Sequence, residues 1–147
     1  MLADLIRRLA GPPSREPLAP EDARMALAAL MVRLARTDGS YSTVEQGRID
    51  AMLQDHYHIG AAEAARVRAE AEVAEANAQD TVQFTRLIKQ AVPYEERTGI
   101  VESLWRVAVA DGISADERGL MRLVADLLGV SDQDSGLARQ RVLRDDG

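Results

Sequence analysis

Two short acidic segments have the residue types and spacing that could bind a cation. Each contains Asp-Gly and then Ser-x-x-Glu, with the acidic residues Asp38 and Glu45 in the first segment and Asp111 and Glu117 in the second. We name these segments, 38–45 and 111–117, the acidic elbows. Hard cations such as Ca²⁺ and Mg²⁺ require several oxygen ligands, and carboxylates on a tight loop supply them. The chemistry indicated is binding of a divalent cation.

Neither elbow has the ligand pattern of an EF-hand. If Asp38 took position 5 of the calcium loop, positions 1 and 3 would be Leu34 and Arg36, which cannot bind Ca²⁺. In the second elbow, Glu117 comes one residue too early for position 12. One site would have to combine both elbows, with Asp116 as a further candidate beside Asp38, Glu45, Asp111 and Glu117. Without a cation, these crowded carboxylates would repel one another.

The same residues also have a purely structural interpretation. Gly39 and Gly112 can take the left-handed conformation that ends a helix. Ser-x-x-Glu is the pattern of a capping box, in which the Ser and Glu side chains bond free backbone N–H groups at the start of a helix. The sequence leaves both interpretations open.

Other candidates for chemistry are few. His56 and His58 form a His-x-His pair that could bind a transition metal, with Asp55 as a third ligand. Residues two apart on a helix point in different directions, so a partly buried or helix-end histidine is the favoured interpretation. The chain has no Cys, no Gly-rich phosphate loop and no Ser–His–Asp set. We therefore expect a protein that is not an enzyme.

The elements that would position the elbows are helices, and the fold class expected is all-α. We expect residues 1–10 to form an amphipathic helix, 11–20 a Pro-rich linker, 21–143 the helical domain and 144–147 a tail. Within the domain, helices are expected at 21–37, from 42, at 60–76, near 84–91, at 93–110, at 114–129 and at 131–143. Those at 21–37 and 93–110 are apolar nearly all round, which predicts a central position.

Two further expectations concern which helix faces are buried. The helix at 60–76 is rich in Ala and Glu, with little to bury, and is expected on the outside. In the helix at 114–129, the inner face is expected to consist of Leu120, Leu123, Val124 and Leu127. When the two elbow segments are aligned, His56 matches Leu128, an inner-face position. Trp105 is expected in the core.

The two helix–elbow–helix segments match position by position. A shift of 73 residues takes Arg33 to Arg106 and Asp38 to Asp111, and a shift of 72 then takes Glu45 to Glu117. Because both helices and the loop between them match, the sequence predicts an internal duplication of a helical hairpin. Two such hairpins would pack around a pseudo-two-fold axis, with their elbows at one end of the bundle.

Composition limits the class of protein. The chain has 147 residues, enough for one domain, and a net charge of −6, which gives no support to nucleic-acid binding. No apolar run reaches the roughly 18 residues that a membrane span needs. The simplest expected location is the cytoplasm.

The paired elbows, their separation and the ending LLGVSDQDSGLARQRVL resemble the TerB-like tellurite-resistance family over about residues 21–143. The resemblance implies a compact bundle of two related halves. It also implies a cation site at Asp38, Glu45, Asp111 and Glu117, and action with a membrane-integral partner, at the inner face of the membrane, in stress resistance. The function expected is thus a non-enzymatic module that binds a divalent cation. The alternative is a metal-free protein-interaction module whose elbows are only caps and turns, with the N-terminal helix as its contact surface.

Overall fold

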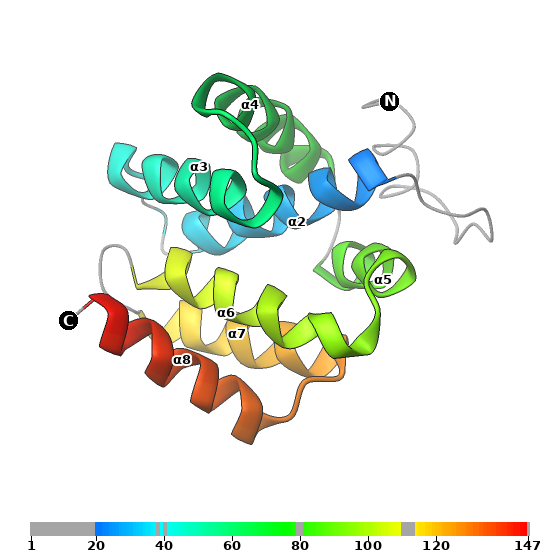
Figure 1. The fold of residues 1–147 in the computed structure, drawn as a ribbon, viewed down its shortest axis with the longest axis vertical. Helices are drawn as coiled ribbons and strands as arrows, with labels where there is room; N and C mark the ends of the chain where they lie inside the picture. The colour runs from blue at the N-terminus through cyan, green and yellow to red at the C-terminus, as the bar shows by residue number, and fades with distance from the viewer. Residues whose placement is uncertain (1–19, 38, 40, 79–80, 110–113, 147) are drawn as a thin grey trace.

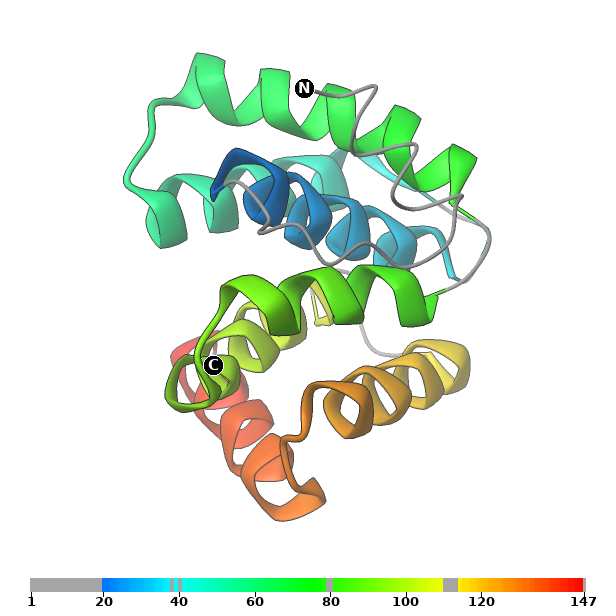
Figure 2. The same cartoon turned by 90° about the vertical axis from the view of Figure 1, so that its right-hand side faces the viewer.

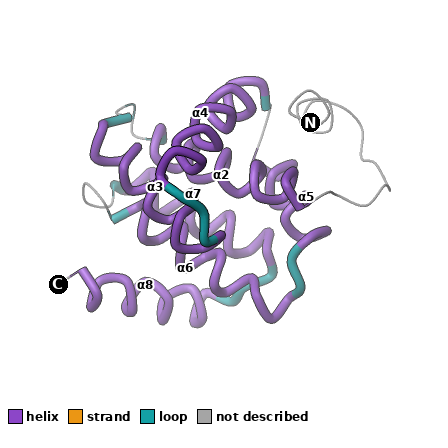
Figure 3. The backbone as a smooth tube through the Cα atoms, turned by 45° about the horizontal axis from the view of Figure 1, so that its top comes forward, coloured by secondary structure: helices purple, strands orange, loops and turns teal. Residues whose placement is uncertain are grey.

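The computed structural model describes residues 20–37, 39, 41–78, 81–109 and 114–146. In this part all regular secondary structure is helical, short loops join the helices, and there is no strand (Figure 3). The elements are α2 (Pro20–Arg36), α3 (Thr43–Tyr57), α4 (Ala61–Asn77), α5 (Thr81–Ala91), the 3-10 turn η1 (Tyr94–Glu96), α6 (Arg97–Ala108), α7 (Ala115–Leu128) and α8 (Asp132–Asp146). The predicted all-α class is confirmed. The predicted N-terminal helix at 1–10 and the linker, except for Pro20, lie outside the described residues.

The helices form two groups that lie one above the other. Helices α2, α3 and α4 make one group and α6, α7 and α8 the other, with α5 at one side (Figures 1 and 2). Within each group the third helix packs on the first, α4 on α2 and α8 on α6. Contacts of α2 and α3 with α6 join the groups, and α5 bridges α2 and α7. The two halves therefore pack in parallel ways, while their common origin by duplication stays a prediction.

Helix α2 lies at the centre, as its apolar circumference predicts. Every residue from Met25 to Val32 is at most 7% exposed, and most are fully buried. The polar residues Arg33 and Arg36 come in its last turn, where cations favour the negative end of the helix dipole. In α6, Leu104 is fully buried and Trp105 is 6% exposed, so the predicted core position of Trp105 is confirmed. Each such large side chain contributes about 1.5–3 kcal/mol to folding by leaving water.

Helix α4 covers one side of the first group, as its position in Figure 1 shows. Its buried residues are small, Ala64, Ala71 and Ala74 together with Val67, and they pack against α2 and α3. The other larger aliphatic residue, Val73, is 48% exposed. A helix with alanines on its inner face can approach its neighbours closely, and its Glu and Arg side chains then bridge to them.

The predicted inner face of α7 was right for Val124, which is 1% exposed, and wrong for Leu123. The face that packs consists of Met121, Val124, Ala125 and Leu128, whereas Leu123 is 44% exposed. Leu120 and Leu127 are only partly buried. Residues on a helix are rotated by about 100° each, so the stripe that begins at Met121 is turned by that angle from the stripe that begins at Leu120. The Leu stripe is more apolar, but the stripe that faces α5 and α6 is the one that is buried, because the neighbouring helices decide which face of α7 is covered.

The helix ends follow their local sequence with small shifts. Gly129 has φ 77°, and the Val130 amide donates to the Ala125 carbonyl at 2.8 Å, so α7 stops where the glycine predicted. Ser131 Oγ accepts from the Asp134 amide at 3.1 Å and starts α8, which continues three residues beyond the predicted Leu143. After Pro93 the chain makes the turn η1 before α6 begins at Arg97.

Candidate functional site

Each acidic elbow leads into a complete capping box. At the start of α3, Ser42 Oγ accepts from the Glu45 amide at 3.1 Å, and the Ser42 amide donates to Glu45 Oε1 at 2.9 Å. At the start of α7, the same two bonds join Ser114 and Glu117 at 3.0 and 3.1 Å. The backbone angles also agree, with φ −79° and ψ 163° at Ser42 and φ −77° and ψ 165° at Ser114. The predicted capping boxes are confirmed.

Glu45 and Glu117 are also buried. Each is 3% exposed, and among the described residues they are the only acidic side chains in the buried class. A buried carboxylate is costly unless it is hydrogen-bonded or paired with a cation. Their place in the first turn of a helix gives some compensation, because the helix dipole is positive there. The two matched glutamates thus share an uncommon environment, which the Ser-x-x-Glu pattern alone did not predict.

The ends of the helices that carry the elbows lie at the same end of the bundle. The C-terminal ends of α2 and α6 and the N-terminal ends of α3 and α7 are all on the left of Figure 1. Gly39, with φ 81°, turns the first elbow away from α2. Asp38 and Asp111 lie outside the described residues, so the predicted set of four carboxylates stays a prediction. Asp116, the further candidate, is exposed.

A model of the family "Tellurite resistance protein TerB" matches residues 24–140. The chain belongs to the TerB family. The match runs from the first turns of α2 into α8 and so includes both helix groups and both elbows. A search of the curated proteins and a search of the solved structures each gave no match. No helix in the described part of this TerB-family chain is long and apolar enough to cross a membrane.

Beside the first elbow, the TerB-family chain has a polar network that sequence reasoning missed. The Tyr41 hydroxyl donates to Glu72 Oε2 at 2.6 Å, and Arg68 Nη1 donates to the same oxygen at 3.0 Å. Arg68 Nε donates in turn to Asp50 Oδ1 at 2.7 Å. Burial, followed by the contact with Glu72, raises the pKa of Tyr41, so the phenol stays protonated and can donate. The spacing of Arg68 and Glu72 was the available signal, but it did not reveal Tyr41.

A second group of contacts joins the last turn of α2 to α4. Glu75 Oε1 accepts from Arg33 Nε at 3.3 Å, and Glu75 Oε2 accepts from Arg36 Nη1 at 2.8 Å. Arg33 Nη2 also donates to the Ala78 carbonyl at 3.1 Å, and Arg36 lies over the Tyr41 ring at 5.0 Å. The first elbow is therefore held between α2 and α4 by charged and aromatic contacts on both sides.

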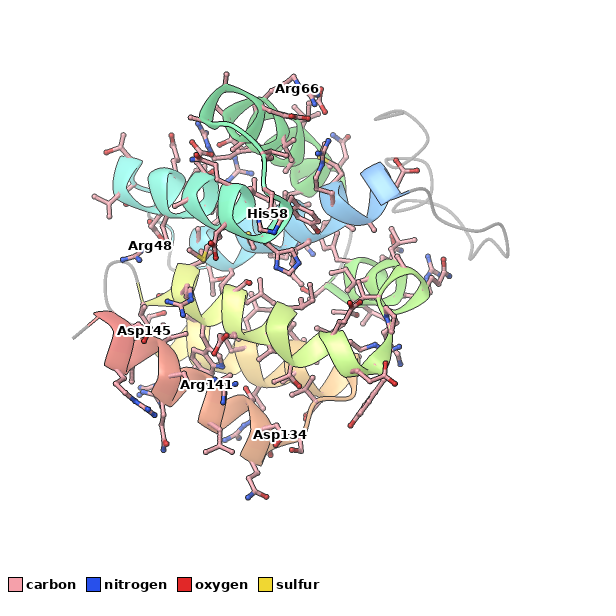
Figure 4. All side chains as sticks on the ribbon, viewed as in Figure 1. Arg48, His58, Arg66, Asp134, Arg141 and Asp145 are labelled. Atoms are coloured by element: carbon pink, nitrogen blue, oxygen red, sulfur yellow. The ribbon has the colours of Figure 1, made fainter. Side chains whose placement is uncertain are left out.

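The residue that matches Arg33 in the second half has an equivalent role. Arg106 Nη2 donates to Asp145 Oδ2 at 2.7 Å, so each of the matched arginines pairs with an acid on the third helix of its own group. Arg141 Nε donates to Glu102 Oε1 at 2.6 Å, and Figure 4 shows Arg141 and Asp145 on α8. The indole of Trp105 donates to Ser135 Oγ at 3.1 Å, which satisfies its buried N–H.

The histidines lie far from the elbows. His58 is the C-cap of α3, with φ 56°, and Figure 4 shows it at the opposite end of this helix from Arg48. Fifteen helical residues span about 22 Å, so neither His56 nor His58 can join the elbows in one site. The helix-end interpretation is confirmed. Leu128 is buried, as expected of an inner-face position, but His56, which aligns with it, is exposed. Tyr57 packs on the core instead, and burial raises its pKa to about 12.

Across the described residues, no group of three or more His, Asp or Glu side chains is placed so that it could hold a metal ion. The described residues include the His-x-His pair and Asp55, but not Asp38 or Asp111. The elbows therefore remain the candidate site, with two buried glutamates in known positions and two aspartates outside the described residues.

Proposed function

We propose that this TerB-family protein is a non-enzymatic module that binds one divalent cation of the Ca²⁺ or Mg²⁺ class between its two acidic elbows. The ligands proposed are Asp38, Glu45, Asp111 and Glu117. The observation that carries the proposal is the matched burial of Glu45 and Glu117, each 3% exposed at the same end of the bundle. Of the described acidic residues, only these two are withdrawn from water, and both belong to elbows.

The chemistry of the available groups supports a hard cation. The chain has no Cys, and both histidines lie at the far end of α3, so oxygen ligands are what the elbow end offers. Each capping box uses Oε1 of its glutamate. A cation shared by the two glutamates would offset the cost of burying both charges, and the two aspartates would raise the number of oxygen ligands.

A shared ion would also make the stability of the module depend on the concentration of that ion. One elbow belongs to α2 and α3, and the other to α6 and α7, so a common ion would cross-link the two helix groups. Binding to the folded state alone stabilises a protein, by about 2.7 kcal/mol when the free ligand is at 100 times its dissociation constant. From the family match we further propose a role in tellurite or other stress resistance, at the inner face of the membrane and with a membrane-associated protein as the partner.

Calorimetric titration with Ca²⁺, Mg²⁺, Mn²⁺ and Zn²⁺ tests the proposal. The wild-type protein is compared with the Asp38→Asn/Asp111→Asn double variant. The matched control is Asp126→Asn/Asp134→Asn, which removes the same charge from two exposed residues outside the elbows. Saturable heat that only the elbow variant loses supports a shared ion site. Heat that is absent, or equal in all three proteins, contradicts it.

One observation favours a second candidate function, a metal-free protein-interaction module. The two capping boxes give Ser42, Glu45, Ser114 and Glu117 a complete structural role without any ion. In that case the amphipathic N-terminal residues 1–10 would be the contact surface. Removing residues 1–19 separates the two functions, because partner binding should be lost while ion binding at the elbows should survive.

A further inference from the structure

A cavity of about 380 Å³ opens between α5, α7 and the start of α6. Its volume falls in the range of small-molecule sites, roughly 300–1,000 Å³. It lies beside α5, on the opposite side of the molecule from the elbow end in Figure 1, and so is independent of the proposed cation site.

The cavity has cations on its wall, although the protein as a whole carries a net charge of −6. Arg86, Lys89 and Arg97 line it, and none of the described residues that line it is acidic. Arg97 is already engaged, since its guanidinium donates to the carbonyl groups of Val92 and Leu128 at 3.2 and 3.4 Å. Arg86 and Lys89 are therefore the cations available to a ligand.

Arg86 has a buried donor without an acceptor. Within the described residues, its Nε is inaccessible to water and has no hydrogen-bond partner. Two other arginines also have an unpaired buried Nε, but Arg24 pairs with Glu63 through Nη1, and Arg139 lies over the Trp105 ring. Because the Nε itself is closed to solvent, a ligand in the cavity would reach the Nη groups of Arg86 and not its Nε.

The rest of the wall consists of two aliphatic side chains, Val82 and Leu127, and two uncharged polar ones, Thr85 and Gln90. Val82, from α5, is 49% exposed, and Leu127, from α7, also lines the cavity. Leu123, one turn before Leu127, is 44% exposed, so the Leu stripe that the core left uncovered leads toward this cavity. The Thr85 hydroxyl donates a hydrogen bond to the Val82 carbonyl at 2.9 Å. Cations on one side and aliphatic side chains on the other suit a ligand with one charged end.

We propose that this cavity binds a small amphiphilic anion, one carboxylate or phosphate group joined to a short apolar chain. Arg86 and Lys89 bind the anionic group, and Val82 and Leu127 cover the apolar chain. A guanidinium matches the paired oxygens of either anion, and such charge-assisted hydrogen bonds are stronger than neutral ones.

The test is an NMR titration of the ¹⁵N-labelled full chain with octanoate and with octyl phosphate, which distinguish the two anions. Octanol, which lacks the charge, and acetate, which lacks the chain, are the reference compounds. The variants are Arg86→Gln and Lys89→Gln, and the control is Arg144→Gln, an exposed arginine on α8 outside the cavity. Dispersion of the amide spectrum shows that each variant is folded.

The expected result is saturable shifts at Val82, Arg86 and Leu127 with octanoate or octyl phosphate. Binding should be about tenfold weaker in Arg86→Gln, as loss of a charge-assisted hydrogen bond implies, and unchanged in Arg144→Gln. Equal binding of octanol, equal binding by Arg86→Gln, or shifts spread over the whole chain would overturn the proposal. So would a cavity that responds only to an Asp- and Glu-rich peptide, which would make it a protein-docking site.

Discussion

Glu45 and Glu117 occupy the same position in two separate capping boxes. Each is the third residue of its helix, each is 3% exposed, and each accepts through Oε1 from the amide of a Ser three residues earlier, at 2.9 and 3.1 Å. Matched burial of two carboxylates in one small domain concentrates negative charge near the elbow end. Both glutamates also complete capping boxes, so replacing them would disturb the starts of α3 and α7. Tests of ion binding are therefore best directed at Asp38 and Asp111.

Removing either capping hydroxyl should destabilise the fold. We expect Ser42→Ala and Ser114→Ala each to lower the free energy of unfolding by about 1 kcal/mol, because a backbone donor at the start of α3 or α7 loses its acceptor. Urea denaturation followed by circular dichroism measures the change. Ser103→Ala is the control, since the Ser103 hydroxyl only bonds the Gly99 carbonyl within α6. A similar loss in all three variants would mean that the capping boxes have no special role.

The contact between Glu75 and the two arginines of α2 should matter more than surface ion pairs on the same helix. The Glu75 side chain is 13% exposed and bonds both Arg33 and Arg36, so Glu75→Gln should lower the free energy of unfolding by about 1–3 kcal/mol. Glu70→Gln, which removes the more exposed pair with Arg66, should change it by less than about 0.5 kcal/mol. Denaturant titration compares the two, and equal effects would contradict the structure.

The register of α7 is tested by two identical substitutions on one helix. Leu128 is fully buried, whereas Leu123 is 44% exposed. Leu128→Ala should therefore lower the free energy of unfolding by about 2–5 kcal/mol, and Leu123→Ala by less than about 1 kcal/mol. Thermal unfolding of the two variants gives the answer. A larger loss for Leu123→Ala would restore the inner face that the sequence predicted.

His56 should make stability depend on pH. Although His56 lies at the surface, partial desolvation by its neighbours lowers its pKa below 6.5, and the opposing carboxylates of Asp55 and Glu96 do not compensate. The unfolded chain then binds the proton more readily, so stability is fully present above about pH 6.5 and is lost as the pH falls toward the folded pKa. NMR titration of the imidazole measures the pKa, with His56→Gln to assign the signal. A pKa at or above 6.5 would contradict this prediction.

Local sequence patterns predicted the helices of this protein well, because caps and glycines act through nearby atoms. Ser42, Ser114 and Ser131 begin helices and Gly129 ends one, as their patterns indicate. The central position of α2 also followed from its own residues, since a helix that is apolar all round has no face for solvent.

The errors concern contacts between helices. Leu123 and Leu127 looked like core residues because Leu is more apolar than Met121 or Ala125, but the neighbouring helices cover the other face of α7. The Tyr41–Glu72 bond joins residues 31 apart in the chain, and no local spacing identifies it. The elbows were found through their repeated acidic pattern, whereas the burial of Glu45 depends on how the helices around it pack.

The central claim is that two elbows share one ion, and the number of ions bound per chain tests it most directly. Equilibrium dialysis against Ca²⁺, with the bound metal counted by mass spectrometry, should give one ion per wild-type chain. Asp111→Asn alone should abolish binding, because half a site does not supply enough oxygen ligands. Two ions per chain would mean that each elbow binds by itself, and no bound ion under saturating Ca²⁺, Mg²⁺ or Mn²⁺ would mean that the elbows are caps and turns only.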